Sequence, residues 1–440
     1  MKWFLILLSV LSAILISCSS SEKVRYDNYR IFQIRPDNSV RYNLLENHIG
    51  NESYQVLRYP RHEDGISELL VPPEKVESFK NFLESDGFDF DVVVGNVQKL
   101  IDEEEADQVG RDDFSWTAYH NLDRIYGWLD HILETYPQET SAFVIGKSFE
   151  GREIRGLKIS YKPNNPGIFV ESNIHAREWI TSATATYLIK ALLTSNDTNV
   201  QNIARNFDWY IIPVVNVDGF VYSHQHVCLE LLEVTIQFQE YKINVPIFQN
   251  RMWRKTRQPH SSLCIGADPN RNFDSYWMAN GGASSQPCSE TYGGPKPFSE
   301  PETLALANFY RSISRKVTLY LAFHSYGQYI LFPYGHTNKE APKNLRDLTT
   351  VADDAAKAIR NLYGTRYTVG TVAGTLYIAS GGGSDWAYNE GGARLAYTFE
   401  FRDKGNTGFL LPARQIIPNA EETLDGIVAM LKSAKNLAYF

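Results

Sequence analysis

The sequence lacks the features of a membrane protein and of a nucleic-acid-binding protein. After the N-terminal apolar run, no segment is long and apolar enough to span a membrane, so we expect no membrane-embedded domain. No basic stretch is interleaved with aromatic residues, and the formal net charge is -8, so we expect no nucleic-acid partner.

Cysteine is also scarce, since the only four are Cys18, Cys228, Cys264 and Cys288. In an oxidising compartment Cys264 and Cys288 could close a local loop, and Cys18 would leave with a signal peptide. Cys228 then has no partner in the sequence, which marks the segment around it as unusual.

The N-terminus has the layout of a secretory signal peptide. Lys2 precedes an apolar run over residues 3–16, and small residues follow at 17–21. We therefore expect residues 1–22 to be removed and the protein to be secreted and extracellular. Residues 15–18 also resemble a bacterial lipoprotein cleavage box that would make Cys18 a lipid anchor, but we favour ordinary secretion.

A length of 440 residues predicts more than one domain. Residues 23–111 predict a small α+β unit, an open sandwich of helices on an antiparallel sheet. Its expected strands are 29–35, 54–57, 66–71 and 88–94, and its expected helices are 40–47 and 73–84. The acidic run 100–107 then predicts a helix-like linker or a solvated face.

Residues 112–440 predict a large α/β domain with a mixed central sheet and helices on both faces. The expected strands are 141–145, 154–160, 168–172, 209–215, 317–323, 329–332 and 395–401, and the expected helices are 183–193, 301–313, 343–363 and 418–437. In such a domain functional side chains lie at strand ends and in loops.

A histidine and a carboxylate three residues apart, His175 and Glu178, follow the apolar run 167–174. At this spacing both side chains can face one ion where the chain leaves a strand. A zinc ion that does chemistry needs about three protein ligands and one open position, so this motif could supply two ligands. Alone the pattern is weak, because most such pairs are solvated.

The third ligand has several candidates. His324 ends the apolar run 317–323, so it also lies where a strand meets a loop, although a lone histidine there is ordinarily a hydrogen-bonded core residue. The competing histidines lie in turn-rich segments with weaker positions: His224, His226, His260 and His336.

Glu400 interrupts a strand-like aromatic run at 397–403. A carboxylate in such a place is seldom tolerated unless it is paired, and near a metal it could act as a general base. Alternatively, it faces solvent on an edge strand and pairs with Arg402 or another neighbour. The pattern leaves both interpretations open.

Arginines lie among aromatic and turn residues in the segments 253–255 and 270–272. A planar guanidinium suits a carboxylate or an oxyanion, although an exposed arginine is ordinarily a solubility residue. The segment 377–386 adds a glycine-rich stretch beside Tyr377, which predicts either a mobile loop at a site or a plain surface turn.

Together these motifs resemble those of the zinc metallocarboxypeptidases of the carboxypeptidase A/B type, which are made as secreted proenzymes. The resemblance covers residues 114–440 and, more loosely, the segment before them. It rests on motifs in the same order along the chain: 175–179 (HAREW), 253–257 (WRKTR), 268–273 (DPNRNF), 288–292 (CSETY), 324–326 (HSY), 384–386 (SDW) and 399–403 (FEFRD).

The resemblance implies a catalytic role for five matched residues. His175, Glu178 and His324 would bind one zinc ion per chain. Glu400 would be the general base, which takes a proton from water and later gives it to the leaving amine. Arg254 would polarise the carbonyl and stabilise the oxyanion.

Other matched residues would bind the substrate or support the fold. Asn270 and Arg271 would capture the free carboxylate of a peptide, which makes the enzyme an exopeptidase, and Tyr377 would close over that end. Arg177 would make a secondary substrate contact. The family disulfide would join Cys264 to Cys288.

The resemblance also implies a specificity. In this family an acidic residue at the floor of the side-chain pocket selects C-terminal Lys or Arg, and the matching position here is Ser384. The other matched pocket residues are Gly335, Val372, Ala379 and Thr398. This neutral set predicts an A-like preference for aliphatic or aromatic C-terminal residues.

The chain departs from the family at residues 227–249, where the family has only a few residues. The stretch could be an inserted β-rich loop. We favour a retained intron translated in frame, because Val227-Cys228 and Ile247-Phe248-Gln249 can be encoded by GTATGT and ATTTTTCAG, which resemble intron ends. Removing the stretch restores family spacing and removes the odd Cys228.

We therefore expect a secreted, monomeric zinc carboxypeptidase proenzyme that acts on the C-termini of peptides and proteins. A trypsin-like protease would activate it by cutting after Arg111, with Lys99 as the alternative site. The competing hypothesis is a catalytically impaired relative that binds peptides, which requires the insert 227–249 to be present and to displace Arg254. A regulatory, hormone-trimming carboxypeptidase is a third hypothesis, but such enzymes lack this prosegment.

Overall fold

The computed structural model describes residues 24–51, 54–58, 65–106, 114–224 and 250–440. The expected signal peptide 1–22, the expected cut at Arg111, His226, and the insert 227–249 with Cys228 lie outside the described residues. In the described part of the chain, no helix is long and apolar enough to cross a membrane.

The N-terminal unit is an antiparallel sheet covered by helices, as the sequence predicts. Its four strands have the order β2-β3-β1-β4. Phe32 of β1 and Phe79 of α3 meet edge to face in its core, with ring centroids 5.2 Å apart. The elements are β1 (Arg30–Arg35), α2 (Ser39–Asn51), β2 (Gln55–Arg58), β3 (Ser67–Val71), η1 (Pro73–Lys75), α3 (Val76–Ser85), β4 (Asp89–Val94) and α4 (Val97–Ala106).

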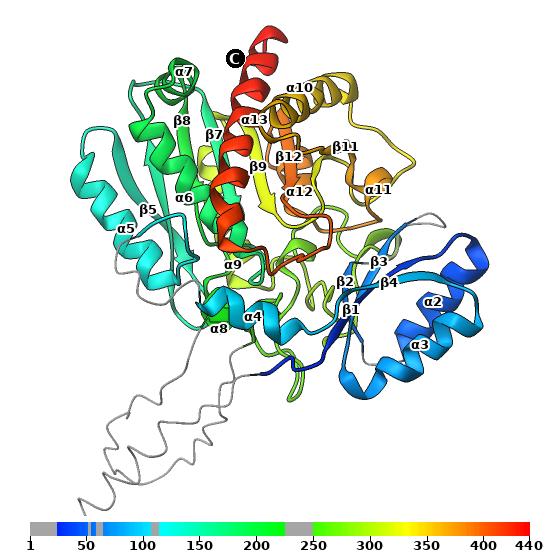
Figure 1. Cartoon of the computed structure of the whole chain (residues 1–440). Helices are drawn as coiled ribbons and strands as arrows, with labels where there is room; N and C mark the ends of the chain where they lie inside the picture. The colour runs from blue at the N-terminus through cyan, green and yellow to red at the C-terminus, as the bar shows by residue number, and fades with distance from the viewer. Residues whose placement is uncertain (1–23, 52–53, 59–64, 107–113, 225–249) are drawn as a thin grey trace, which may run out of the picture.

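The large unit is built on an eight-stranded mixed sheet of order β11-β10-β12-β9-β7-β8-β6-β5 (Figure 1). This confirms the predicted fold class, and all predicted strands are present. The strands are β5 (Thr140–Lys147), β6 (Glu153–Ile159), β7 (Gly167–Ser172), β8 (Asp208–Ile212), β9 (Val317–His324), β10 (Tyr329–Phe332), β11 (Thr368–Thr371) and β12 (Leu395–Glu400).

The helices of the large unit include all four predicted ones and several that the sequence patterns did not indicate. The predicted ones are α6 (Trp179–Thr194), α9 (Pro301–Ile313), α10 (Leu345–Tyr363) and α13 (Ile416–Asn436). The others are α5 (Leu122–Thr135), α7 (Thr198–Asn206), α8 (Val217–His224), η2 (Pro269–Arg271), η3 (Ala279–Gly281), α11 (Val372–Thr375), α12 (Gly383–Asn389) and η4 (Ala413–Gln415).

Helix α12 corrects one expectation. The glycine-rich segment 377–386 is not a surface turn, because its second half forms a helix whose residues 383–387 are all buried. Trp386 packs there against Phe273, with ring centroids 5.6 Å apart. Burial of this aromatic side chain outweighs the weak helix propensity of the glycines.

Alternate residues of the central strand β7 face two different layers. Phe169 meets the ring of Tyr310 on α9 at 5.2 Å. Its neighbour Ile168 lies beside Trp209 in the parallel pairing of β7 and β8, and the Trp209 indole donates to the Ile203 carbonyl of α7. Because successive side chains of a strand point to opposite faces, helices cover both sides of the sheet.

The carboxyl ends of three parallel strands lie next to one another. β7 pairs in parallel with β9, and β9 pairs in parallel with β12. The second pairing sets Glu400 directly beside His324. The alternative in which Glu400 lies on an edge strand is therefore wrong, because β12 has β10 and β9 on its two sides, and Arg402 pairs with Glu422 instead.

The N-terminal unit lies against the large unit (Figure 1), and polar side-chain contacts join the two. Glu68 of β3 accepts a hydrogen bond from the Tyr326 hydroxyl, and Arg58 of β2 donates to the Tyr329 hydroxyl. Helix α4 adds a buried ion pair between Glu104 and Arg251, with nitrogen–oxygen distances of 2.6 and 2.9 Å.

We expect Phe169→Ala to lower the free energy of unfolding by about 3–5 kcal/mol, because it removes a fully buried ring from the centre of the sheet. Val144→Ala, on the outer strand β5 where Val144 is 49% exposed, should cost less than about 1 kcal/mol. Urea unfolding of the two variants measures the difference. Equal losses would contradict this account of the core.

Candidate active site

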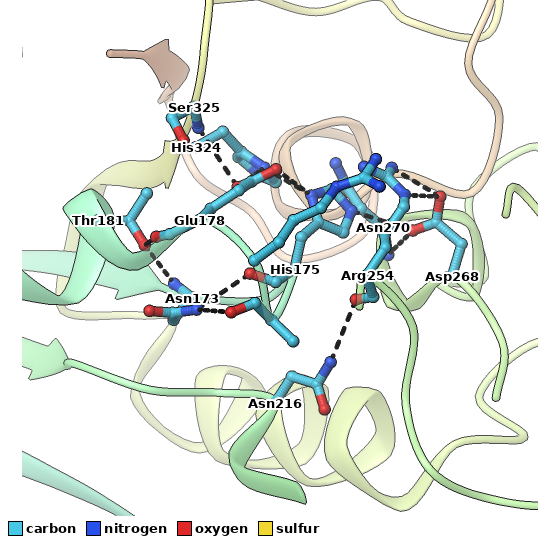
Figure 2. Close-up of polar contacts among 12 residues, drawn as sticks. Asn173, His175, Glu178, Thr181, Asn216, Arg254, Asp268, Asn270, His324 and Ser325 are labelled. Atoms are coloured by element: carbon cyan, nitrogen blue, oxygen red, sulfur yellow. Dashed lines mark hydrogen bonds and ion pairs between the residues drawn. The ribbon is translucent and has the colours of Figure 1, made fainter. Parts of the chain in front are cut away.

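Three potential metal ligands converge at the carboxyl ends of β7 and β9 (Figure 2). One nitrogen or oxygen atom from each of His175, Glu178 and His324 lies within 4.8 Å of the others, and all three residues are buried. The Nδ1 atoms of His175 and His324 are 3.2 Å apart. Oxygens of Glu178 lie 2.8 Å from the first Nδ1 and 3.2 Å from the second.

This donor set fits a zinc ion. Two imidazole nitrogens and one carboxylate are a ligand set of catalytic zinc sites, and a cation between the two facing nitrogens removes the repulsion of their lone pairs. Glu178 also draws positive charge into the site. Burial would lower the pKa of His324, but the Glu178 carboxylate raises it to about 9, so this carboxylate favours positive charge at the site.

A buried carboxylate orients His175 from behind. Asp268 Oδ1 lies 3.0 Å from His175 Nε2, which leaves Nδ1 free to face the site if Nε2 carries the proton. Burial, and after it the Arg254 cation, lowers the pKa of His175. The ring is thus held neutral, as a metal ligand must be.

The second oxygen of Asp268 holds Arg254. It accepts from Arg254 Nη2 at 2.7 Å and from Nε at 3.2 Å (Figure 2). Burial would raise the pKa of the Asp268 carboxyl, but the Arg254 guanidinium holds it well below its usual range. The motif 268–273 does not by itself indicate this bridging role; the only signal for it in the sequence is an acidic residue two positions before Asn270.

Glu400 lies at the carboxyl end of the neighbouring strand β12, beside His324. Burial raises the pKa of the Glu400 carboxyl to about 8, although the positive charge of His324 opposes the shift. Arg58 of the N-terminal unit also opposes it. A carboxyl with its pKa near neutrality is suited to exchanging protons with a substrate.

Asn270, Arg271 and Tyr377 form a second polar group. Asn270 Oδ1 accepts from the Gly383 backbone at 2.8 Å, and Arg271 Nη2 lies 3.5 Å from the Tyr377 hydroxyl. Arg271 is 2% exposed, and its Nε has no partner among the described residues. A buried guanidinium with an unused donor is suited to bind an anion such as a carboxylate.

The five expected pocket residues form two contacting sets, Ser384 with Thr398, and Gly335 with Val372 and Ala379. Ser384 and Thr398 share a hydrogen bond of 2.6 Å between their hydroxyls. A Cβ atom at Gly335 would lie 2.8 Å from the Ala379 carbonyl oxygen and 3.2 Å from Val372 Cγ1.

Arg177 is brought to the same region but faces other partners. Its Nη1 lies 3.3 Å from Glu290 and 3.4 Å from the Met252 carbonyl, and its guanidinium is 4.2 Å from the Phe409 ring centre. Gln55 of the N-terminal unit donates to the same Met252 carbonyl. The N-terminal unit thus covers the surroundings of Arg177.

The competing histidines have other partners. His224 stacks on Trp179, with ring centroids 3.6 Å apart. His260 lies 3.0 Å from Glu300, and His336 lies 3.0 Å from Asp385. Among the described residues, only His175, Glu178 and His324 form a group that could hold a metal.

Comparison with known proteins matches this geometry to one family. Residues 125–426 match the family model described as zinc carboxypeptidase, and residues 32–104 match the carboxypeptidase activation peptide. The chain belongs to the zinc carboxypeptidase family. This confirms the resemblance stated from the motifs, and it identifies the N-terminal unit of this zinc carboxypeptidase as an activation peptide and the chain as a zymogen.

The zinc carboxypeptidase is similar to insect relatives. Zinc carboxypeptidase A 1 of Drosophila melanogaster is 40% identical over 99% of this chain and 98% of its own length. Zinc carboxypeptidase of Simulium vittatum is 49% identical over 73% of this chain and 98% of its own. The solved carboxypeptidase A of Helicoverpa armigera superposes with a TM-score of 0.81 at 28% identity, covering 95% of this chain and 100% of that one.

These findings confirm the enzyme class, its zinc cofactor and its peptide substrates, and they do not favour an impaired peptide-binding relative. The disulfide between Cys264 and Cys288 is present, with Cα atoms 4.8 Å apart.

We expect Asp268→Ala to weaken zinc binding by about 10- to 100-fold, because His175 loses the group that orients its ring. Competition with a chromophoric chelator measures the affinity. Asp268→Asn is the comparison variant: its amide oxygen can still accept from His175, but its amide NH2 replaces the oxygen that accepts from Arg254, so we expect a smaller loss of zinc affinity than in Asp268→Ala. Zinc affinity unchanged in Asp268→Ala would contradict the orienting role.

Proposed function

We propose that this zinc carboxypeptidase is a secreted, monomeric enzyme that removes aliphatic or aromatic residues from peptide C-termini. The proposal is supported chiefly by the buried Arg271, whose Nε has no partner among the residues that the structure describes and which lies beside Asn270 and Tyr377. A site for a free carboxylate makes the enzyme an exopeptidase. The neutral hydroxyl pair of Ser384 and Thr398 supports the choice of side chain. Secretion is inferred from the signal-like N-terminus and the disulfide.

In this proposal His175, Glu178 and His324 hold the zinc ion. When bound, zinc supplies a Lewis acid that polarises a carbonyl and makes water a better nucleophile. Asn270 and Arg271 bind the terminal carboxylate, and the Tyr377 hydroxyl near Arg271 closes over it. This binding fixes which peptide bond lies near Glu400.

Glu400 and Arg254 then act on the bound peptide. The Glu400 carboxylate accepts a proton from the attacking water and delivers it to the leaving amine. Arg254 donates to the carbonyl oxygen as negative charge develops there, and Asp268 holds the guanidinium in place before the reaction. Because Arg254 is already buried and paired, little reorganisation is needed in the transition state.

We expect the trypsin-treated protein to cleave a peptide with C-terminal Phe and to lose that activity with a zinc chelator. Glu400→Gln should lower kcat by about 10²- to 10⁴-fold with zinc content unchanged, because the proton acceptor is lost. Steady-state kinetics with peptides ending in Phe, Leu, Lys and Arg measure both the activity and the preference. A preference for Lys or Arg would refute the proposed specificity, and full activity of Glu400→Gln would refute the proposed base.

We further propose that residues 1–22 are a signal peptide, 23–111 the activation domain and 112–440 the catalytic domain, with the insert 227–249 a retained intron. Two contacts support a boundary after α4. Glu104 of α4 is bound to Arg251, and Phe114 stacks on His120 and Trp128 at 4.2 and 4.9 Å. A cut between Glu104 and Phe114 leaves both packed units intact.

We expect a trypsin-like protease to activate the proenzyme at Arg111, which is the only basic residue between Ala106 and Phe114. Lys99 lies within helix α4, where the backbone is unsuited to a protease. Arg111→Gln should therefore slow activation by trypsin at least tenfold, whereas Lys99→Gln should activate like the wild type. N-terminal sequencing of the product should begin at Asp112, and normal activation of Arg111→Gln would show that another site is used.

A further inference from the structure

The walls of the side-chain pocket come from separate segments that must be held in register. Gly335 follows strand β10, Ala379 lies between α11 and α12, and Ser384 belongs to α12. Ala379 donates its backbone N–H to the Gly335 carbonyl at 2.8 Å. That bond alone does not tie Gly335 to α12.

A single buried carboxylate makes that connection. Asp385, next to Ser384 on α12, accepts from the Gly335 backbone N–H at 2.8 Å and from the His336 backbone N–H at 3.2 Å. The His336 ring adds a third contact, with Nδ1 3.0 Å from the same Asp385 oxygen. Asp385 is 3% exposed, so these groups compete with little water.

The His336 ring is also held on its face. Tyr276 stacks on it with ring centroids 3.6 Å apart and planes 4° apart. Tyr276 follows the Asn270–Arg271 pair along the chain, and that segment is bound to the start of α12 by Phe273 N–H to Gly381 O and Gly381 N–H to Ser275 O, at 3.0 and 3.1 Å. His336 thus contacts Tyr276, in the segment that follows Asn270 and Arg271, and also Asp385 of α12.

We propose that His336 is a positioning residue: through Asp385 it holds Gly335 against helix α12 and so sets the fit of the pocket to a large C-terminal side chain. The inference rests on the proposed function, because it concerns the pocket assigned there. It follows from the tight approach of Gly335 to Val372 and Ala379, since a small movement of residues 335–336 changes the distance between the pocket walls.

The test compares His336→Phe with His336→Asn in the zinc-loaded, trypsin-activated enzyme. Phenylalanine keeps a ring against Tyr276 but removes the donor to Asp385. Asparagine removes the ring and can place an amide N–H near the position of Nδ1. Peptides ending in Phe and in Ala are compared, because an alanine side chain scarcely enters the pocket.

We expect His336→Phe to raise KM for the Phe peptide about tenfold with kcat changed less than about twofold, and to leave KM for the Ala peptide nearly unchanged. His336→Asn should restore KM for the Phe peptide to within about threefold of wild type. Melting temperature and zinc content show that both variants are folded and loaded. If His336→Phe does not fold, Asp385→Asn, which removes the charge that accepts from all three donors, carries the same expectation.

Different outcomes refute the proposed function and the role of His336. A wild-type enzyme that fails to cleave the Phe peptide refutes the proposed function. A wild-type enzyme that cleaves it, with the same ratio of KM values for Phe and Ala peptides in His336→Phe, refutes the role of His336 alone. A parallel loss on both peptides, or a loss of kcat without a change in KM, also refutes it, because either indicates general structural damage.

Discussion

The buried carboxylate of Asp268 connects the parts of the site. One oxygen faces His175 and the other binds Arg254, while the backbone N–H of Asn270 also donates to the first oxygen at 2.9 Å. One side chain therefore links the candidate metal ligand His175, the proposed oxyanion-binding residue Arg254 and the segment of Asn270 that is proposed to bind the substrate carboxylate. A buried carboxylate is costly unless it is fully paired, so each of these partners stabilises the ionised form that holds the others.

The sheet supplies the second constraint. Parallel pairing of β7, β9 and β12 brings the carboxyl ends of these three strands together. The register between β9 and β12 sets Glu400 beside His324. A shift of one residue in this pairing would turn the side chains of the strand to the opposite face of the sheet. The register therefore decides whether the proposed base Glu400 lies near the candidate metal ligands. The apolar core on both sides of the sheet keeps the register in place.

The activation domain contacts the large unit beside these strand ends. Arg58 and Glu68 contact Tyr329 and Tyr326, and Tyr329 is paired with Glu400 across β10 and β12. The N-terminal unit thus covers the neighbourhood of the proposed base with its own charged side chains, which is a direct physical basis for latency. The Glu104–Arg251 pair anchors α4, the last helix of this unit, just upstream of the connection to the catalytic domain.

The sequence by itself determined the fold class, the strands except β11 (Thr368–Thr371), and the identity of the candidate ligands, because apolar periodicity and residue type are local properties. The local pattern alone could not decide between a metal ligand and a core residue for His324, or between an edge and an interior strand for Glu400; only the resemblance to a family favoured the ligand and the base. Those choices depend on which strands are neighbours, and strands distant in the chain are brought together only by packing. The bridging role of Asp268, the helix α12 inside a glycine-rich segment and the contact of His336 with Asp385 likewise appear only when residues far apart in the chain share one buried space.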